Sequence, residues 1–166
     1  MNACRYAFIM ENSIRQEVIL RMQNDTMQLK PILEMVSTCQ ETLINILQQV
    51  ISKVDLSTYP ELNALQVLFD TNWTENFKFE ICKGETTEQL MDLYMNLSAL
   101  SSITERSLQF YRQAANNSAY EYEKIFFNSL AEQKKVIKRR IDSALRVVYN
   151  SLWSQVGFAP FIFGKE

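Results

Sequence analysis

The chain of 166 residues contains no histidine. It therefore lacks the imidazole base of serine and cysteine hydrolases, and also the imidazole ligand that most zinc and haem proteins use. Glycine and proline are scarce, with three residues of each. Because tight turns between strands need these residues, the composition excludes a sandwich or barrel of many strands and favours helices.

Neither basic nor acidic residues are in clear excess. The 17 basic and 19 acidic residues give a net charge of −2, which argues against nucleic acid or an anionic membrane as the main partner. One local basic run is more typical of a solvated helix face than of a phosphate-binding strip, and it comprises Lys134, Lys135, Lys138, Arg139 and Arg140.

The sequence contains neither a long apolar run nor a regular cysteine pattern. No apolar stretch approaches the ~18 residues of a membrane span, and the apolar patch in the first ten residues, which Glu11 interrupts, is too short for a signal peptide. The cysteines, Cys4, Cys39 and Cys82, are odd in number and far apart, which indicates reduced thiols. A cytoplasmic protein is therefore expected.

Four segments carry apolar residues at spacings of three and four, the pattern of amphipathic helices. They form two pairs, over residues 7–54 and 86–152. Thr86 with Gln89 forms a capping-box pattern at the start of the third helix, and Ser118 with Glu121 does so for the fourth. Each apolar stripe is interrupted by one polar residue, and these are Glu11, Gln40, Thr104 and Lys134.

These stripes predict an all-α protein, a four-helix bundle that forms one domain over residues 1–166. Residues 55–85 are expected to be a long crossover that contains a short helix and an extended piece. The tail, residues 153–166, is rich in aromatic side chains that are candidates for an interface, namely Trp153, Phe158, Phe161 and Phe163.

The two helix pairs also align with each other. Residues 30–37 and 124–131 lie in register at an offset of 94, and at nearly the same offset Glu11 falls opposite Thr104. This alignment suggests an internal repeat of one helical hairpin.

The second pair carries the clearest family resemblance. Residues 105–115 read ERSLQFYRQAA and residues 126–134 read FFNSLAEQK. They resemble the rubrerythrin-type branch of the ferritin-like superfamily, in which a helix with a phenylalanine-tyrosine pair and two alanines precedes a helix with leucine-alanine and glutamates before a histidine. The resemblance implies a ferritin-like bundle of two helix pairs joined by a long crossover.

In that family, each half of the bundle supplies one glutamate and one Glu-x-x-His to a pair of irons. These ligand positions fall on Glu11, Gln40, Leu43, Thr104, Lys134 and Ile137, of which Glu11 alone retains a ligand. The resemblance therefore implies a degenerate site that binds no metal or other cofactor, without catalytic residues. Other glutamates are assigned to outer helix faces, and these are Glu17, Glu34, Glu41, Glu105 and Glu132.

The inward positions of Glu11 and Lys134 suggest that the lysine ammonium replaces the positive charge of the metal. Gln40 and Thr104 are then expected to complete the hydrogen bonds of this interior ion pair. In the alternative, Lys134 extends to solvent and Glu11 lies outside the core.

Three functions are compatible with these features of the sequence. The first is a metal-free, non-catalytic bundle that acts through protein association, as a homodimer, because bundles of this family commonly pair. The second is an iron-binding oxidoreductase with an unconventional carboxylate site. The third is a pocket for a small apolar ligand, oriented by Glu11 and Lys134.

Overall fold

A computed structural model describes residues 3–24, 29–52 and 85–156 of the chain. These residues form α1 (Ala3–Asn24), α2 (Lys30–Ser52), α5 (Thr87–Asn117) and α6 (Glu121–Val156), with no strand among them. The all-α prediction is therefore confirmed for this part of the chain. No helix within it is both long enough and apolar enough to cross a membrane.

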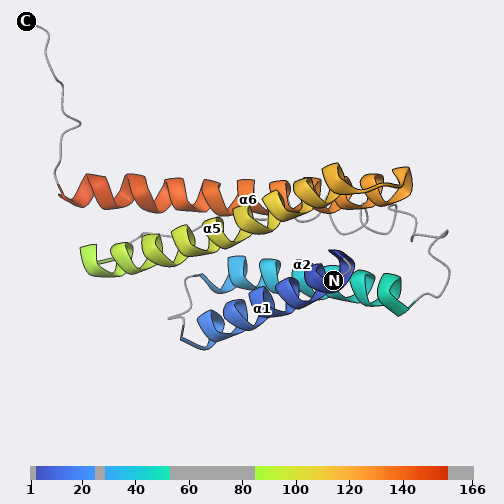
Figure 1. Cartoon of the computed structure of the whole chain (residues 1–166). Helices are drawn as coiled ribbons and strands as arrows, with labels where there is room; N and C mark the ends of the chain where they lie inside the picture. Colours follow the sequence, from blue (N-terminus) through green and yellow to red (C-terminus); the bar gives the residue numbers. More distant parts are fainter. Residues whose placement is uncertain (1–2, 25–28, 53–84, 157–166) are drawn as a thin grey trace, which may run out of the picture.

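The helices form two antiparallel hairpins, α1 with α2 and α5 with α6 (Figure 1). α1 also packs against α5, so the hairpins lie face to face. α2 and α5 run in the same direction, which places Ser52 and Thr87 at opposite ends of the helices. The crossover predicted for 55–85 lies outside the described residues except for Glu85, and so do Phe158, Phe161 and Phe163.

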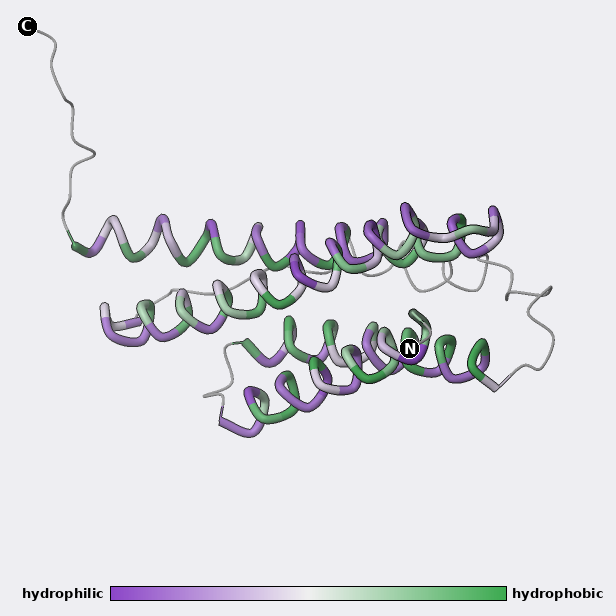
Figure 2. Tube along the Cα trace, viewed as in Figure 1, coloured by the Kyte–Doolittle hydropathy of each residue, from purple (hydrophilic) through white to green (hydrophobic). Residues whose placement is uncertain are grey.

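The apolar stripes of all four helices are buried in a shared core. Figure 2 shows the apolar turns of α2 and α6 directed toward the other hairpin. One cluster of buried side chains takes a residue from every helix, for example Val18, Val36, Leu97 and Ile141. A second cluster does the same through Ala7, Leu47, Tyr111 and Phe127. Because a fully buried aliphatic side chain contributes about 1.5–3 kcal/mol, these clusters hold the hairpins together.

Two predicted helix starts have different outcomes. The capping box is confirmed, because Thr86 accepts from the backbone N–H of Gln89 and the Gln89 side chain accepts from the N–H of Thr86. The cap predicted at Ser118 is wrong. Its hydroxyl donates to Ala114 O at 2.7 Å and its N–H to Ala115 O, so it ends α5, and α6 begins at Glu121.

The outer bounds of the helices also differ from the prediction. α1 begins at Ala3 rather than residue 7, and α6 continues to Val156 rather than ending at residue 152. Trp153 therefore belongs to a helix and not to a tail. It is 40% exposed, and its ring packs edge-on against Tyr149 with centroids 5.6 Å apart.

Candidate functional site

The four polar residues that interrupt the apolar stripes are all buried. The exposed fraction is 0% for Glu11, 2% for Gln40, 3% for Thr104 and 1% for Lys134. Each belongs to a different helix. A buried charge is tolerated only when it is paired and hydrogen-bonded, so their partners decide what this interior polar site does.

The structure brings Glu11 and Lys134 together. Lys134 Nζ lies 2.7 Å from Glu11 Oε2, which joins α6 to α1 through the interior. The alternative in which the lysine extends to solvent does not describe this arrangement. The attraction between these two charges is the main interaction that offsets the free-energy cost of removing each of them from water.

The second carboxylate oxygen of Glu11 is held from α5. Glu11 Oε1 accepts from Ser107 Oγ at 2.9 Å and from the Tyr111 hydroxyl at 2.7 Å. Sequence reasoning missed both donors, although Tyr111 lies on an inward stripe and Ser107 precedes it by one turn. With three donors on its two oxygens, Glu11 is satisfied as a carboxylate.

The roles expected of the other two polar residues are not seen. Thr104 Oγ1 donates to Leu100 O at 2.8 Å, one turn back in its own helix, so it does not complete the ion pair. Gln40 Oε1 is buried without a hydrogen-bond partner in the described part of the chain. The side chains that donate hydrogen bonds to Glu11, besides Lys134, are therefore Ser107 and Tyr111. The sequence had predicted Thr104 and Gln40 in this role.

The interior position of these groups shifts the acidity of two neighbours. Burial raises the pKa of Tyr111 well above its usual value, and the adjacent Glu11 carboxylate raises it further by charge and by accepting its hydrogen bond. Burial also raises the pKa of the Cys39 thiol, an effect that the charges of Lys134 and Arg140 oppose. Both groups are therefore protonated at neutral pH.

The residues at the expected ligand positions do not fit a pair of irons. Leu43 and Ile137 are apolar and buried, at 1% and 2% exposure, and the ammonium of Lys134 occupies one oxygen of Glu11. No group of three or more histidine, cysteine or acidic side chains that could hold a metal exists among the described residues. None of the five glutamates assigned to outer faces is buried, and they are Glu17, Glu34, Glu41, Glu105 and Glu132.

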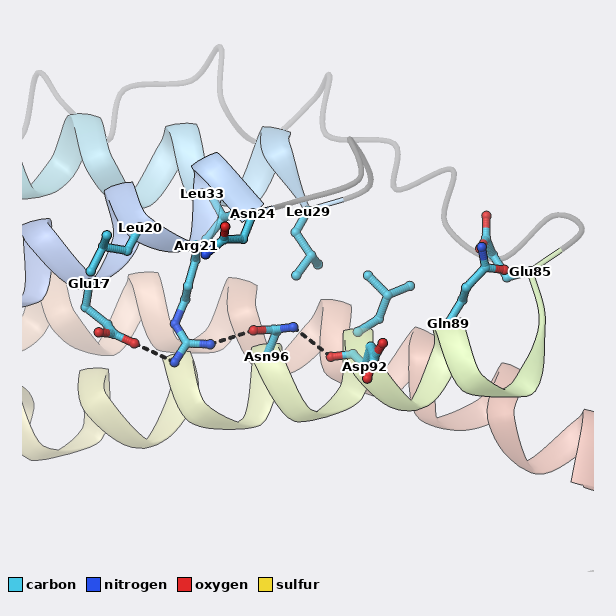
Figure 3. A pocket seen from close by; sticks show the side chains of 11 residues that line it. Glu17, Leu20, Arg21, Asn24, Leu29, Leu33, Glu85, Gln89, Asp92 and Asn96 are labelled. Atoms are coloured by element: carbon cyan, nitrogen blue, oxygen red, sulfur yellow. Dashed lines mark hydrogen bonds and ion pairs between the residues drawn. The ribbon is translucent and has the colours of Figure 1, made fainter.

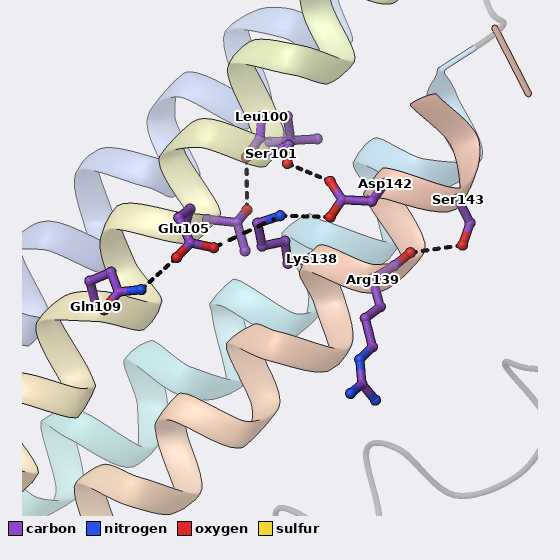
Figure 4. A network of polar contacts seen from close by, with 9 residues as sticks. Leu100, Ser101, Glu105, Gln109, Lys138, Arg139, Asp142 and Ser143 are labelled. Carbon is purple, nitrogen blue, oxygen red and sulfur yellow. Dashed lines mark hydrogen bonds and ion pairs between the residues drawn. The ribbon is translucent and has the colours of Figure 1, made fainter. Parts of the chain in front are cut away.

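The basic run on α6 does not form a continuous positive face. Lys134 points into the core, and Lys135 pairs with Glu132 at 3.2 Å. Figure 4 shows Lys138 between two acidic side chains, at 2.6 Å from Asp142 and 3.8 Å from Glu105. Lys135 and Lys138 are thus paired with acidic neighbours, as expected for a solvated helix face.

A groove of about 490 Å³ lies between α1 and α5, near the start of α2 (Figure 3). Arg21 crosses it, donating to Glu17 Oε1 at 2.7 Å and to Asn96 Oδ1 at 2.6 Å. Glu85 and Asp92 also line the groove. The Arg21 guanidinium is therefore already hydrogen-bonded within the protein. Its bond to Asn96 joins α1 of one hairpin to α5 of the other.

Comparison of the chain with protein-family models, curated proteins and solved structures found no match.

Removal of one partner of the ion pair should destabilise the protein strongly. We expect Lys134→Met to lower the free energy of unfolding by about 3–5 kcal/mol, because it leaves the Glu11 carboxylate buried without a countercharge. Adding Glu11→Gln should recover much of the loss, since the amide oxygen still accepts from Ser107 and Tyr111. Denaturant unfolding of the three proteins measures both effects.

Lys135→Met on the same helix provides the control, with an expected change within about 0.5 kcal/mol because this side chain is partly exposed. Equal stability losses for Lys134→Met with and without Glu11→Gln would contradict the pairing.

The raised pKa of Tyr111 predicts a loss of stability in alkali. Above pH ~10 the unfolded chain releases the phenol proton while the folded chain retains it, so unfolding becomes increasingly favourable as the pH rises toward the folded-state pKa. Between pH ~9 and ~11 the free energy of unfolding should fall more steeply for the native chain than for Tyr111→Phe. Parallel pH profiles in denaturant titrations would show that Tyr111 is not the group responsible.

Proposed function

We propose that this chain is a metal-free, non-catalytic four-helix protein of the ferritin-like type that works through protein association. The observation that carries the proposal is the Glu11–Lys134 ion pair at 2.7 Å, between two positions that the family resemblance assigns to metal ligands. A lysine ammonium there supplies internally the positive charge that a metal would supply. Leucine and isoleucine at the former histidine positions add apolar core on either side.

The contacts of the interior site support a structural role rather than a chemical one. Glu11, Ser107, Tyr111 and Lys134 are between 0% and 1% exposed, and the other three donate their hydrogen bonds to the Glu11 carboxylate. A general acid or base must reach the proton that it transfers. A substrate would have to break the Glu11 hydrogen bonds and open the core before it met any of these groups.

Metal analysis tests the proposal against its main alternative, an iron-binding oxidoreductase. Protein purified without chelator, then loaded anaerobically with Fe(II) and exposed to oxygen, should contain far less than one iron per chain and consume no oxygen beyond the buffer control. Two irons per chain, or oxygen uptake that depends on the protein, would overturn the metal-free assignment. Co-purification of a small apolar molecule in native mass spectrometry would favour the pocket alternative.

Association forms the second half of the proposal, and a homodimer is the expected state. Exposed apolar side chains on α1 support it, among them Ile9 at 56% and Leu20 at 54% exposure. Sedimentation equilibrium at micromolar concentrations should report twice the chain mass of 19.4 kDa. The cytoplasmic location stays a prediction, as does the exclusion of nucleic acid and membranes as partners.

A further inference from the structure

α1 carries apolar residues on both of its faces. Opposite its buried side runs a stripe of exposed, uncharged residues, namely Tyr6, Ile9, Ser13, Gln16, Leu20 and Gln23. Their spacing alternates between three and four residues, which is the spacing of a helix–helix seam, and the stripe is about 26 Å long. Ile9 and Leu20 are 56% and 54% exposed.

Four of the five charged residues of α1 are turned away from this stripe, and Arg5 lies beside its N-terminal end. Arg15 pairs with Glu41 of α2 at 3.4 Å. Glu17 pairs with Arg21, which also reaches Asn96 of α5. Glu11 is buried, so the one remaining charge among the described residues of this helix, on Arg5, lies at its N-terminal end. Except for Arg5, the charged side chains of α1 are thus paired within the protein and do not lie along the stripe.

We propose that the exposed stripe of α1 binds α1 of a second copy of this chain in antiparallel orientation. The inference rests on the association proposed above and names its surface. Reversal of the stripe brings Ile9 opposite Leu20, Ser13 opposite Gln16 and Tyr6 opposite Gln23. Every position in the seam then has a partner from the same stripe, as a two-fold contact requires.

Two properties of the surface favour a second copy as the occupant. A two-fold contact places a surface against itself, so an uncharged stripe avoids the like-charge repulsion that a charged face would suffer. A mainly apolar groove of about 390 Å³ also adjoins Ile9, lined by Arg5 and Phe8 of α1 and by Gln48 and Ile51 of α2. Antiparallel pairing brings Leu20 of the second copy beside this groove, and the same contact occurs twice.

Disulfide cross-linking tests the orientation directly. In the full chain carrying Tyr6→Cys and Gln23→Cys, the two thiols of one α1 are about 26 Å apart and cannot join each other. Mild oxidation should therefore link two copies covalently. Each single variant and the unsubstituted chain serve as controls and should stay unlinked, because antiparallel pairing separates identical positions.

Leu20→Glu tests the surface without a cross-link. It should raise the dimer dissociation constant at least about tenfold in sedimentation experiments, since each copy would bury a carboxylate against Ile9. Met95→Glu removes an equally exposed apolar side chain from α5 and should leave the constant unchanged.

The results of these experiments distinguish the proposed α1 contact from the broader proposal that the chain forms a homodimer. A dimer that is insensitive to Leu20→Glu, or one in which the single cysteine variants link, would overturn the antiparallel α1 contact and leave the association standing. A chain that is monomeric at all concentrations would overturn both.

Discussion

The carboxylate of Glu11 is the point at which three helices of this protein meet. It lies on α1 and accepts from Ser107 and Tyr111 of α5 and from Lys134 of α6. A buried carboxylate without such donors costs several kcal/mol, so an arrangement that moved α1 along or around its axis would lose these contacts together. The ion pair thereby favours the register of the two hairpins in which all of these contacts form.

This constraint also explains the character of α1. Glu11 is directed inward, Arg15 and Arg21 pair with side chains of the protein, and the exposed Arg5 lies beside the N-terminal end of the uncharged stripe. A helix held by a buried ion pair on one side can present an uncharged stripe on the other without a shift of its register in the core. The interior pair and the proposed dimer surface are thus two faces of the same helix.

The sequence predicts the inward positions well because apolar spacing reports directly which side of a helix is buried. Each of the four interrupting residues, from Glu11 to Lys134, lies inside the core. The sequence does not predict which hydrogen bonds these residues form. Whether Thr104 or Ser107 reaches Glu11 depends on the rotation and height of α5 against α1, which no pattern within one helix encodes. The prediction for Ser118 fails for a related reason, because a serine between two helices can end one or begin the next.

The central claim, that a buried ion pair between Lys134 and Glu11 organises the core, is tested most directly by nitrogen NMR of the lysine side chains. A buried, paired ammonium exchanges its protons slowly, so one lysine Nζ signal with protected protons should appear near neutral pH. That signal should vanish in Lys134→Met and shift in Glu11→Gln. A spectrum with no protected ammonium, or one whose protected signal ignores Glu11→Gln, would contradict the account.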